Sequence, residues 1–321
     1  MKKYITLGLF VLMLAVSCKT DSKKEVETEA EPTTASSDLT GNYVSDGYAQ
    51  KDEGYDWVGV TVYQLENDQL EIKVRSRADK KRPTCTLDVE VYKETDVLYY
   101  TQIDGKKVLF QFADNALSIT TENEADSSAL YFYCSGGATV AGNYSKIDGG
   151  LDQDQIDQTQ FSKVLSLQDV GFNVSVFAQD GVNQLTVFTF GLPTEFNETF
   201  DIKDQVVTHA EVEDLNSDGS PELVVFTQHT ENQKGMVHAF SVNNMQSMSM
   251  VYFQPTEENE AINKGYAGHD EFALVETKLV QRFPIFENGE KTARRKQISY
   301  NLVEGEAMRQ FVLSTVSEFE N

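Results

Sequence analysis

The sequence predicts an all-β protein. Apolar residues alternate with polar ones in short runs, Gly- and Asn/Asp-containing turn pairs separate the runs, and no segment keeps a helical period. Alternation with period two is typical of strands that bury one face. We expect two antiparallel β domains, each a sandwich or a flattened barrel, over residues 39–147 and 161–321, with a linker over residues 148–160.

The N-terminus has the order of a secretory signal over residues 1–17. Two lysines precede an apolar stretch that ends at Ser17, and this stretch is too short to span a bilayer as a helix. Cys18 follows Ala-Val-Ser directly, which resembles the lipobox of bacterial lipoproteins, in which that cysteine is acylated. The alternative, an ordinary cleaved signal, leaves Cys18 as an odd thiol.

Residues 18–38 predict a flexible tether. They are rich in Thr, Ser and Glu and show no apolar period, so they cannot bury enough surface to become ordered. Several acyl chains on one cysteine would give lasting anchorage. We therefore expect an exported protein held by lipid in the bacterial envelope, on the periplasmic face of the outer membrane or at the cell surface.

The net charge of the chain indicates which classes of partner it can bind. The chain carries 51 acidic against 27 basic residues, a formal charge of -24, which argues against nucleic acid because no basic surface is left to displace counterions. It favours cationic proteins as partners. The sequence does not determine the oligomeric state, and a dimer is compatible with it.

The first domain contains two cysteines, Cys85 and Cys134, on the apolar phase of their runs. An even pair in an exported chain predicts a disulfide, which would stabilise the fold by about 4 kcal/mol. The four alternating runs are Leu70 to Val74, Cys85 to Val91, Val108 to Phe112 and Leu130 to Cys134.

Two features of this domain leave alternatives open. The tripeptide Gly41-Asn42-Tyr43 recurs at residues 142–144, either by chance or because two strands enter and leave one barrel. The basic cluster is either a solvated strand end or a site for an anion or partner; its members are Arg75, Arg77, Lys80, Lys81 and Arg82.

The second domain begins with a hairpin pattern, two apolar runs on either side of Asp180-Gly181. Further strands are expected at Leu223–Thr227, Met236–Val242, Met248–Phe253, Phe272–Phe286, Gln297–Val303 and Phe311–Val316.

An enzyme is not expected. The four histidines, His209, His229, His238 and His269, show no metal-ligand spacing, and no nucleophile elbow or phosphate-binding glycine loop is present. His269 lies beside Asp270 and Glu271, but sequence neighbours in extended chain point apart. No cofactor is required by this interpretation.

One loop has the pattern of a calcium site. Asp214, Asn216 and Asp218 alternate before Gly219, so their oxygens could face one cation together with those of Ser220 and Glu222. The twelfth position of an EF-hand would need a glutamate and is a valine here. The two open interpretations are a short Ca²⁺ loop and a hydrogen-bonded Asx turn between strands.

Four blocks of the second domain resemble the periplasmic inhibitors of invertebrate-type lysozyme. They are residues 214–223 (DLNSDGSPEL), 264–273 (KGYAGHDEFA), 279–286 (LVQRFPIF) and 305–307 (GEA). The resemblance implies a β-sandwich-like fold and a loop that enters the lysozyme cleft, where a Ser-Gly-x-Tyr motif contacts the catalytic carboxylates.

That motif is absent from the corresponding loop, which reads Glu231, Asn232, Gln233, Lys234 and Gly235. The first domain is similar only in outline to the membrane-bound inhibitors of chicken-type lysozyme, through residues 135–138 (SGGA), which lack the tyrosine. Two hypotheses follow: a lysozyme inhibitor, most readily of the invertebrate type, and a non-inhibitory binding or structural lipoprotein on the same scaffold.

Overall fold

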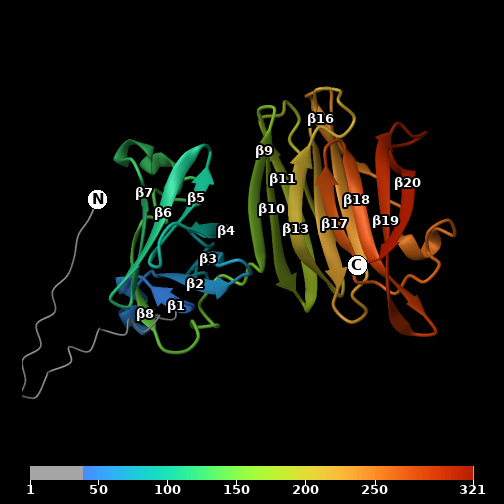
Figure 1. Cartoon of the computed structure of the whole chain (residues 1–321). Helices are drawn as coiled ribbons and strands as arrows, with labels where there is room; N and C mark the ends of the chain where they lie inside the picture. The colour runs from blue at the N-terminus through green and yellow to red at the C-terminus, as the bar shows by residue number, and fades with distance from the viewer. Residues whose placement is uncertain (1–38, 321) are drawn as a thin grey trace, which may run out of the picture. The chain divides into compact units, whose positions relative to one another are not determined.

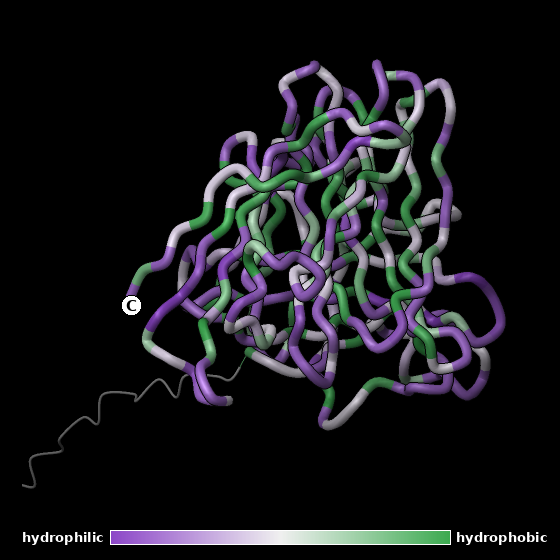
Figure 2. Tube along the Cα trace, turned by 90° about the vertical axis from the view of Figure 1, so that its right-hand side faces the viewer, coloured by the Kyte–Doolittle hydropathy of each residue, from purple (hydrophilic) through white to green (hydrophobic). Residues whose placement is uncertain are grey.

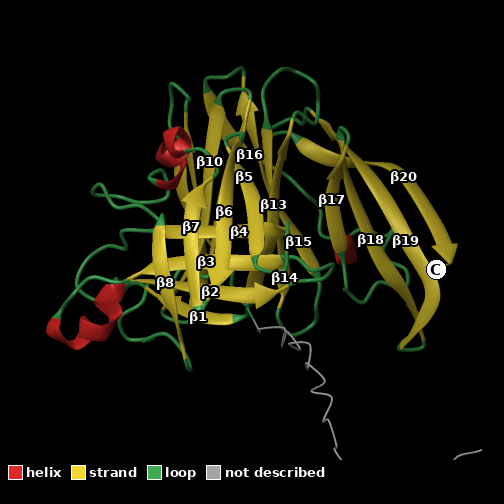
Figure 3. Cartoon of the chain, turned by 60° about the vertical axis from the view of Figure 1, so that its left-hand side comes forward, coloured by secondary structure: helices red, strands yellow, loops and turns green. Residues whose placement is uncertain are grey.

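The computed structural model describes residues 39–320, which lie within one compact unit and whose regular secondary structure is mostly β-strand (Figure 3). The all-β prediction is confirmed. The helical elements described are three 3-10 helices, η1 (Asp46–Glu53), η2 (Glu124–Leu130) and η3 (Thr256–Glu258). None of the described helices has the length and apolar character needed to cross a membrane. The predicted signal, Cys18 and the tether lie outside the described residues.

The first domain is a closed antiparallel barrel of eight strands. The strands are β1 (Gly41–Val44), β2 (Val58–Gln64), β3 (Leu70–Ser76), β4 (Thr86–Lys93), β5 (Leu98–Ile103), β6 (Lys106–Ala113), β7 (Ala116–Thr121) and β8 (Gly142–Ile147). Pairing of β1 with β8 closes the barrel, so the repeated tripeptide does mark the first and last strands. The hydroxyls of Tyr43 and Tyr144 each donate to a carbonyl four residues earlier.

The barrel core and the disulfide agree with the alternation, with one exception. Cys85 and Cys134 are bonded as predicted. The expected strand from Leu130 to Cys134 is wrong, because the segment leaves η2 as a turn and meets the barrel only through an isolated bridge at the cystine. Phe132, on the apolar phase, is 53% exposed. Two serines and an aspartate just before this run favour a helical turn, and β8 takes the closing position.

The second domain has three sheets of four strands where one sandwich or barrel was expected (Figure 1). The first holds β9 (Phe161–Leu167), β10 (Val170–Gln179), β11 (Val182–Phe190) and β12 (Asn197–Asp201). The second holds β13 (Gln205–Glu213), β14 (Glu222–His229), β15 (Gly235–Asn243) and β16 (Ser247–Val251). The third holds β17 (Glu271–Val275), β18 (Lys278–Glu287), β19 (Glu290–Val303) and β20 (Gln310–Glu320).

The middle sheet is buried on both faces. In β14, Leu223 and Val225 belong to the core shared with the β9–β12 sheet. Val224 and Phe226 belong to the core shared with the β17–β20 sheet. Strands covered on both faces read as continuous apolar runs. Along the trace, hydrophobic residues lie mainly in the strands, whereas several of the loops that join them are hydrophilic (Figure 2).

The expected strand from Phe272 to Phe286 is two strands, β17 and β18, which form a hairpin. The apolar alternation runs through the turn without a glycine, and Glu276 adopts a positive φ of 54° there. A non-glycine residue in this region is uncommon, so composition gave no turn signal.

The predicted linker is folded against the barrel. Leu151 and Ile156 form a small separate core with Trp57 and Val44. The indole of Trp57 donates to Gln155 Oε1 at 3.1 Å. A Cβ on Gly59 would lie 2.7 Å from a Leu151 methyl, so this glycine permits the close approach of the segment.

Candidate functional site

The loop of residues 231–235 joins β14 to β15 and is tied down at its base. The Gly235 amide donates to Asp270 Oδ2 at 2.7 Å, and the His269 amide donates to the Gln233 carbonyl at 2.7 Å. Glu231, Asn232 and Gln233 are exposed. The loop therefore has an exposed polar tip on a fixed base.

Asp270 is the centre of a polar network under this loop. Its carboxylate also accepts from the Tyr266 hydroxyl and from Gln281 Nε2, each at 2.6 Å. Burial raises the pKa of Asp270, and these hydrogen bonds oppose the rise. Gln281, fully buried, accepts in turn from Tyr300 at 2.7 Å and donates to Thr256 at 2.8 Å.

The block of residues 264–273 thus supports the loop. Gly268 has φ +84°, and a Cβ there would lie 2.6 Å from the Asn232 carbonyl oxygen, so only glycine fits beside the loop. His269 next to it has φ +63°. Its ring stacks on that of Phe286, with 5.8 Å between the ring centroids.

Lys234 is held by an ion pair with Glu257, Nζ to Oε1 3.4 Å. Both side chains are partly exposed, so the pair is worth little in stability and is screened by salt. A competing carboxylate could therefore displace Glu257.

The loop after β13 has the hydrogen bonds of an Asx turn. The Asp214 carboxylate accepts from the amides of Asp218 and Gly219, each at 3.0 Å. Asp218 accepts from the Ser220 amide at 2.9 Å, and Asn216 accepts from the Asp218 amide at 3.1 Å. The side-chain oxygens that the calcium interpretation needs are thus engaged by backbone N–H groups.

The guanidinium of Arg309 already brings a positive charge to the carboxylates of this loop. Arg309 contacts Asp218 at 2.8 Å and lies 3.6 Å from the buried Glu222. Burial raises the pKa of Glu222 to about 7, against the opposing effects of Ser241, the Leu215 amide and Arg309. Over residues 39–320, no three His, Cys, Asp or Glu side chains are grouped to hold a metal ion. Calcium would have to compete with Arg309.

The basic cluster of the barrel consists of two buried arginines and three exposed residues. Neither a solvated strand end nor an anion or partner site describes the buried arginines. Arg75 and Arg77 are 6% and 4% exposed. Arg75 pairs with Asp88 through two hydrogen bonds and donates to the Thr159 carbonyl at 2.8 Å. Arg77 pairs with Asp79 in the same way. These arginines fasten the 148–160 segment and the β3 end, whereas Lys80, Lys81 and Arg82 are exposed.

The other histidines lie apart from one another. His209 stacks on Phe226 and lies 3.2 Å from Glu211. Burial lowers the pKa of His238 to about 4. The His229 ring accepts from the Glu231 amide at 3.2 Å and so helps to shape the loop.

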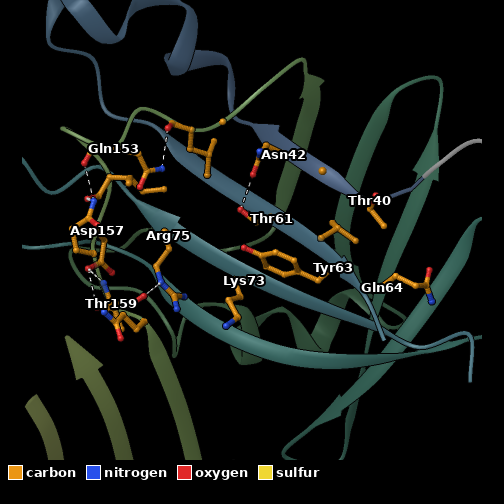
Figure 4. Close-up of a pocket in the computed structure, with 17 residues that line it drawn as sticks. Thr40, Asn42, Thr61, Tyr63, Gln64, Lys73, Arg75, Gln153, Asp157 and Thr159 are labelled. Carbon is orange, nitrogen blue, oxygen red and sulfur yellow. Dashed lines mark hydrogen bonds between the residues drawn. The ribbon is translucent and has the colours of Figure 1, made fainter. Parts of the chain in front are cut away.

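A groove of about 720 Å³ lies on the outside of the barrel, between strands β1–β3 and the 148–160 segment (Figure 4). Tyr63 stands over its floor, and amide and hydroxyl side chains line it. The sequence pattern does not predict this groove. Its floor residues are far apart in sequence, and only the strand register brings them together.

No protein-family model matches the sequence, and no curated protein matches it.

Proposed function

We propose that this chain binds a lysozyme, of the invertebrate type first, and inhibits it by placing the tip of the loop of residues 231–235 in the active-site cleft. The observation that carries the proposal is the fixed base of the loop. Asp270 and the His269 amide hold Gly235 and Gln233, and the Thr230 amide holds the other end by donating to the Asp204 carbonyl. A loop held in one conformation loses less entropy on binding, which favours affinity.

The tip of the loop carries hydrogen-bond donors that can bind the carboxylates of such a cleft, and one carboxylate that cannot. Retaining glycosidases hold paired carboxylates about 5 Å apart, so an inhibitor must bring donors. Lys234 can donate to a carboxylate when it leaves Glu257, and the amides of Asn232 and Gln233 are exposed donors. Glu231 must point away from the enzyme carboxylates. The acidic chain would steer a basic enzyme toward the surface.

The test is a cell-wall lysis assay with invertebrate-, chicken- and goose-type lysozymes and the full chain. We expect inhibition of the invertebrate type that weakens with rising salt. Lys234→Ala should weaken it about tenfold, in line with loss of one charge-assisted hydrogen bond. Lys80→Ala, which removes an exposed lysine of the barrel, is the matched control. Equal potency of the parent and Lys234→Ala would place the contact surface elsewhere.

The second candidate is a non-inhibitory envelope binding or structural lipoprotein. The ion pair between Lys234 and Glu257 favours it, because the one cationic side chain of the tip already has a partner. The missing Ser-Gly-x-Tyr motif points the same way. Absence of inhibition of all three lysozyme types, with the protein folded, would favour this candidate.

A further inference from the structure

The floor of the barrel groove is a row of polar residues set by the strand register. Asn42 of β1 lies opposite Thr61 of β2, and Thr61 lies opposite Lys73 of β3. Tyr63, two residues along β2, points to the same outer face and is 48% exposed. The barrel's interior residues alternate with these, so the outer face presents ligand-binding groups without disturbing the core.

One wall of the groove is rigid. Asp157 is buried and accepts from the Thr159 amide at 3.0 Å and from Thr86 Oγ1 at 3.0 Å. On the floor, Asn42 is fixed by a 2.8 Å bond from Thr61 and by a 2.8 Å bond to the Gly149 carbonyl. Such fixed groups would need little reorganisation when a ligand binds.

The two cations that line the groove have acidic partners. Arg75 is neutralised by Asp88 at 2.5 Å, and Lys73 lies 3.3 Å from Glu71. The carboxylate of Asp157 in the wall accepts from Thr86 and Thr159. In a chain with a formal charge of -24, the groove therefore has no excess positive charge that would select an anion. The lining combines apolar surface with hydrogen-bonding groups, because Gln153, Gln158 and Gln160 add amides at the wall.

The exposed ring of Tyr63 has amides and hydroxyls around it, and the Lys73 ammonium lies over the ring, 5.9 Å from its centroid. The face of a tyrosine ring is apolar and electron-rich, so it packs against the C–H face of a sugar ring. Amide groups donate and accept at once, as sugar hydroxyls do. Figure 4 shows Tyr63 in the middle of the groove, between Thr61 and Lys73, with Gln153 on the wall at one end and Gln64 at the other.

We propose that this groove binds a neutral oligosaccharide, with Tyr63 as the stacking platform and the glutamine-rich 148–160 wall as the hydrogen-bonding side. The floor extends across the three strands β1 to β3, about 10 Å at the usual strand spacing, which suits a short chain of sugar rings. The site is separate in sequence and structure from the loop of residues 231–235 and stands independently of lysozyme inhibition.

The test is isothermal titration calorimetry of the full chain with the hexamer of N-acetylglucosamine and with maltohexaose. At least one should bind. Tyr63→Ala should weaken binding by about fivefold or more, and Tyr63→Phe by no more than about threefold, because the ring face is kept. Tyr92→Ala is the matched control, since Tyr92 is 45% exposed on another barrel strand.

Three results would overturn the proposal: no binding of either hexasaccharide at millimolar concentration, equal affinity of the parent and Tyr63→Ala, or binding only of an acidic oligosaccharide such as hexagalacturonate with steep salt dependence. Near-ultraviolet circular dichroism of each variant verifies the fold. Lys234→Ala should bind saccharide like the parent, so loss of inhibition and loss of saccharide binding can be told apart.

Discussion

Asp270 should tolerate neither asparagine nor alanine, although it has no basic partner among its hydrogen bonds. Its two oxygens accept three hydrogen bonds, two at Oδ2 and one at Oδ1. In Asp270→Asn one oxygen becomes an NH₂ group, which would face a donor. Gln281 cannot turn its amide to compensate, because its oxygen accepts from Tyr300 and its nitrogen donates to Thr256.

Asp270→Asn should lower the free energy of unfolding by about 2 kcal/mol, because one buried donor is left without an acceptor. For a domain of this size that lowers the melting temperature by about 4 to 8 °C. Asp270→Ala should cost more, since three donors lose their acceptor. The assay is differential scanning calorimetry, with amide hydrogen exchange at Gly235 as the local readout.

A second-site change tests the reasoning more sharply. In the double variant Asp270→Asn with Gln281→Glu, the new carboxylate can accept from the new amide and from Tyr300, and Thr256 can rotate to donate. Most of the lost stability should return. Gln281→Glu alone should be the least stable, because two carboxylates would meet at a 2.6 Å contact. An Asp270→Asn protein as stable as the parent would refute the network argument.

Four further predictions concern separate parts of the chain. Replacing Cys85 and Cys134 by serine should lower the free energy of unfolding by about 4 kcal/mol, measured by urea denaturation, since the bond spans 49 residues. Because the folded pKa of Glu222 is about 7, above its ordinary value of 4.5, its contribution is present below pH 4.5 and is lost as the pH rises through 7. Between pH 5 and pH 8 the parent should therefore lose about 2.5 kcal/mol more than Glu222→Gln, and parallel pH profiles would contradict this. If the Asp214 loop binds calcium, millimolar calcium should raise the melting temperature of the parent, and it should raise that of Arg309→Ala by more. An unchanged melting temperature in both proteins would support the Asx turn and exclude the calcium site. Cys18→Ala should move the protein from the membrane to the soluble fraction, and continued membrane partition would exclude lipidation at that residue.

The sequence predicted what local periodicity encodes and missed what depends on register. Most of the strands and the disulfide follow from alternation, which is visible within a few residues. The repeated tripeptide left barrel closure as one of two interpretations, and the pairing of β1 with β8 decides between them. The arrangement of the second domain as three stacked sheets could not be predicted. A strand of the middle sheet such as β14 is buried on both faces, and it therefore loses the alternation that would assign it to one core. Arg75 looked like part of a surface patch because its partners, Asp88 and the Thr159 carbonyl, come from other segments. Arg77 looked the same because the carbonyls of Lys51 and Tyr55 that it contacts lie more than 20 residues earlier.

The position of the β13–β16 sheet between two cores has a consequence for how the second domain folds. Neighbouring residues of β14 report on opposite interfaces, Val225 on one and Val224 on the other. Neither outer sheet can detach without exposing every second side chain of the middle one, so the three layers should unfold as one cooperative unit. Fragments that end before β17 would carry a large uncovered apolar face and should aggregate instead of forming a smaller stable domain.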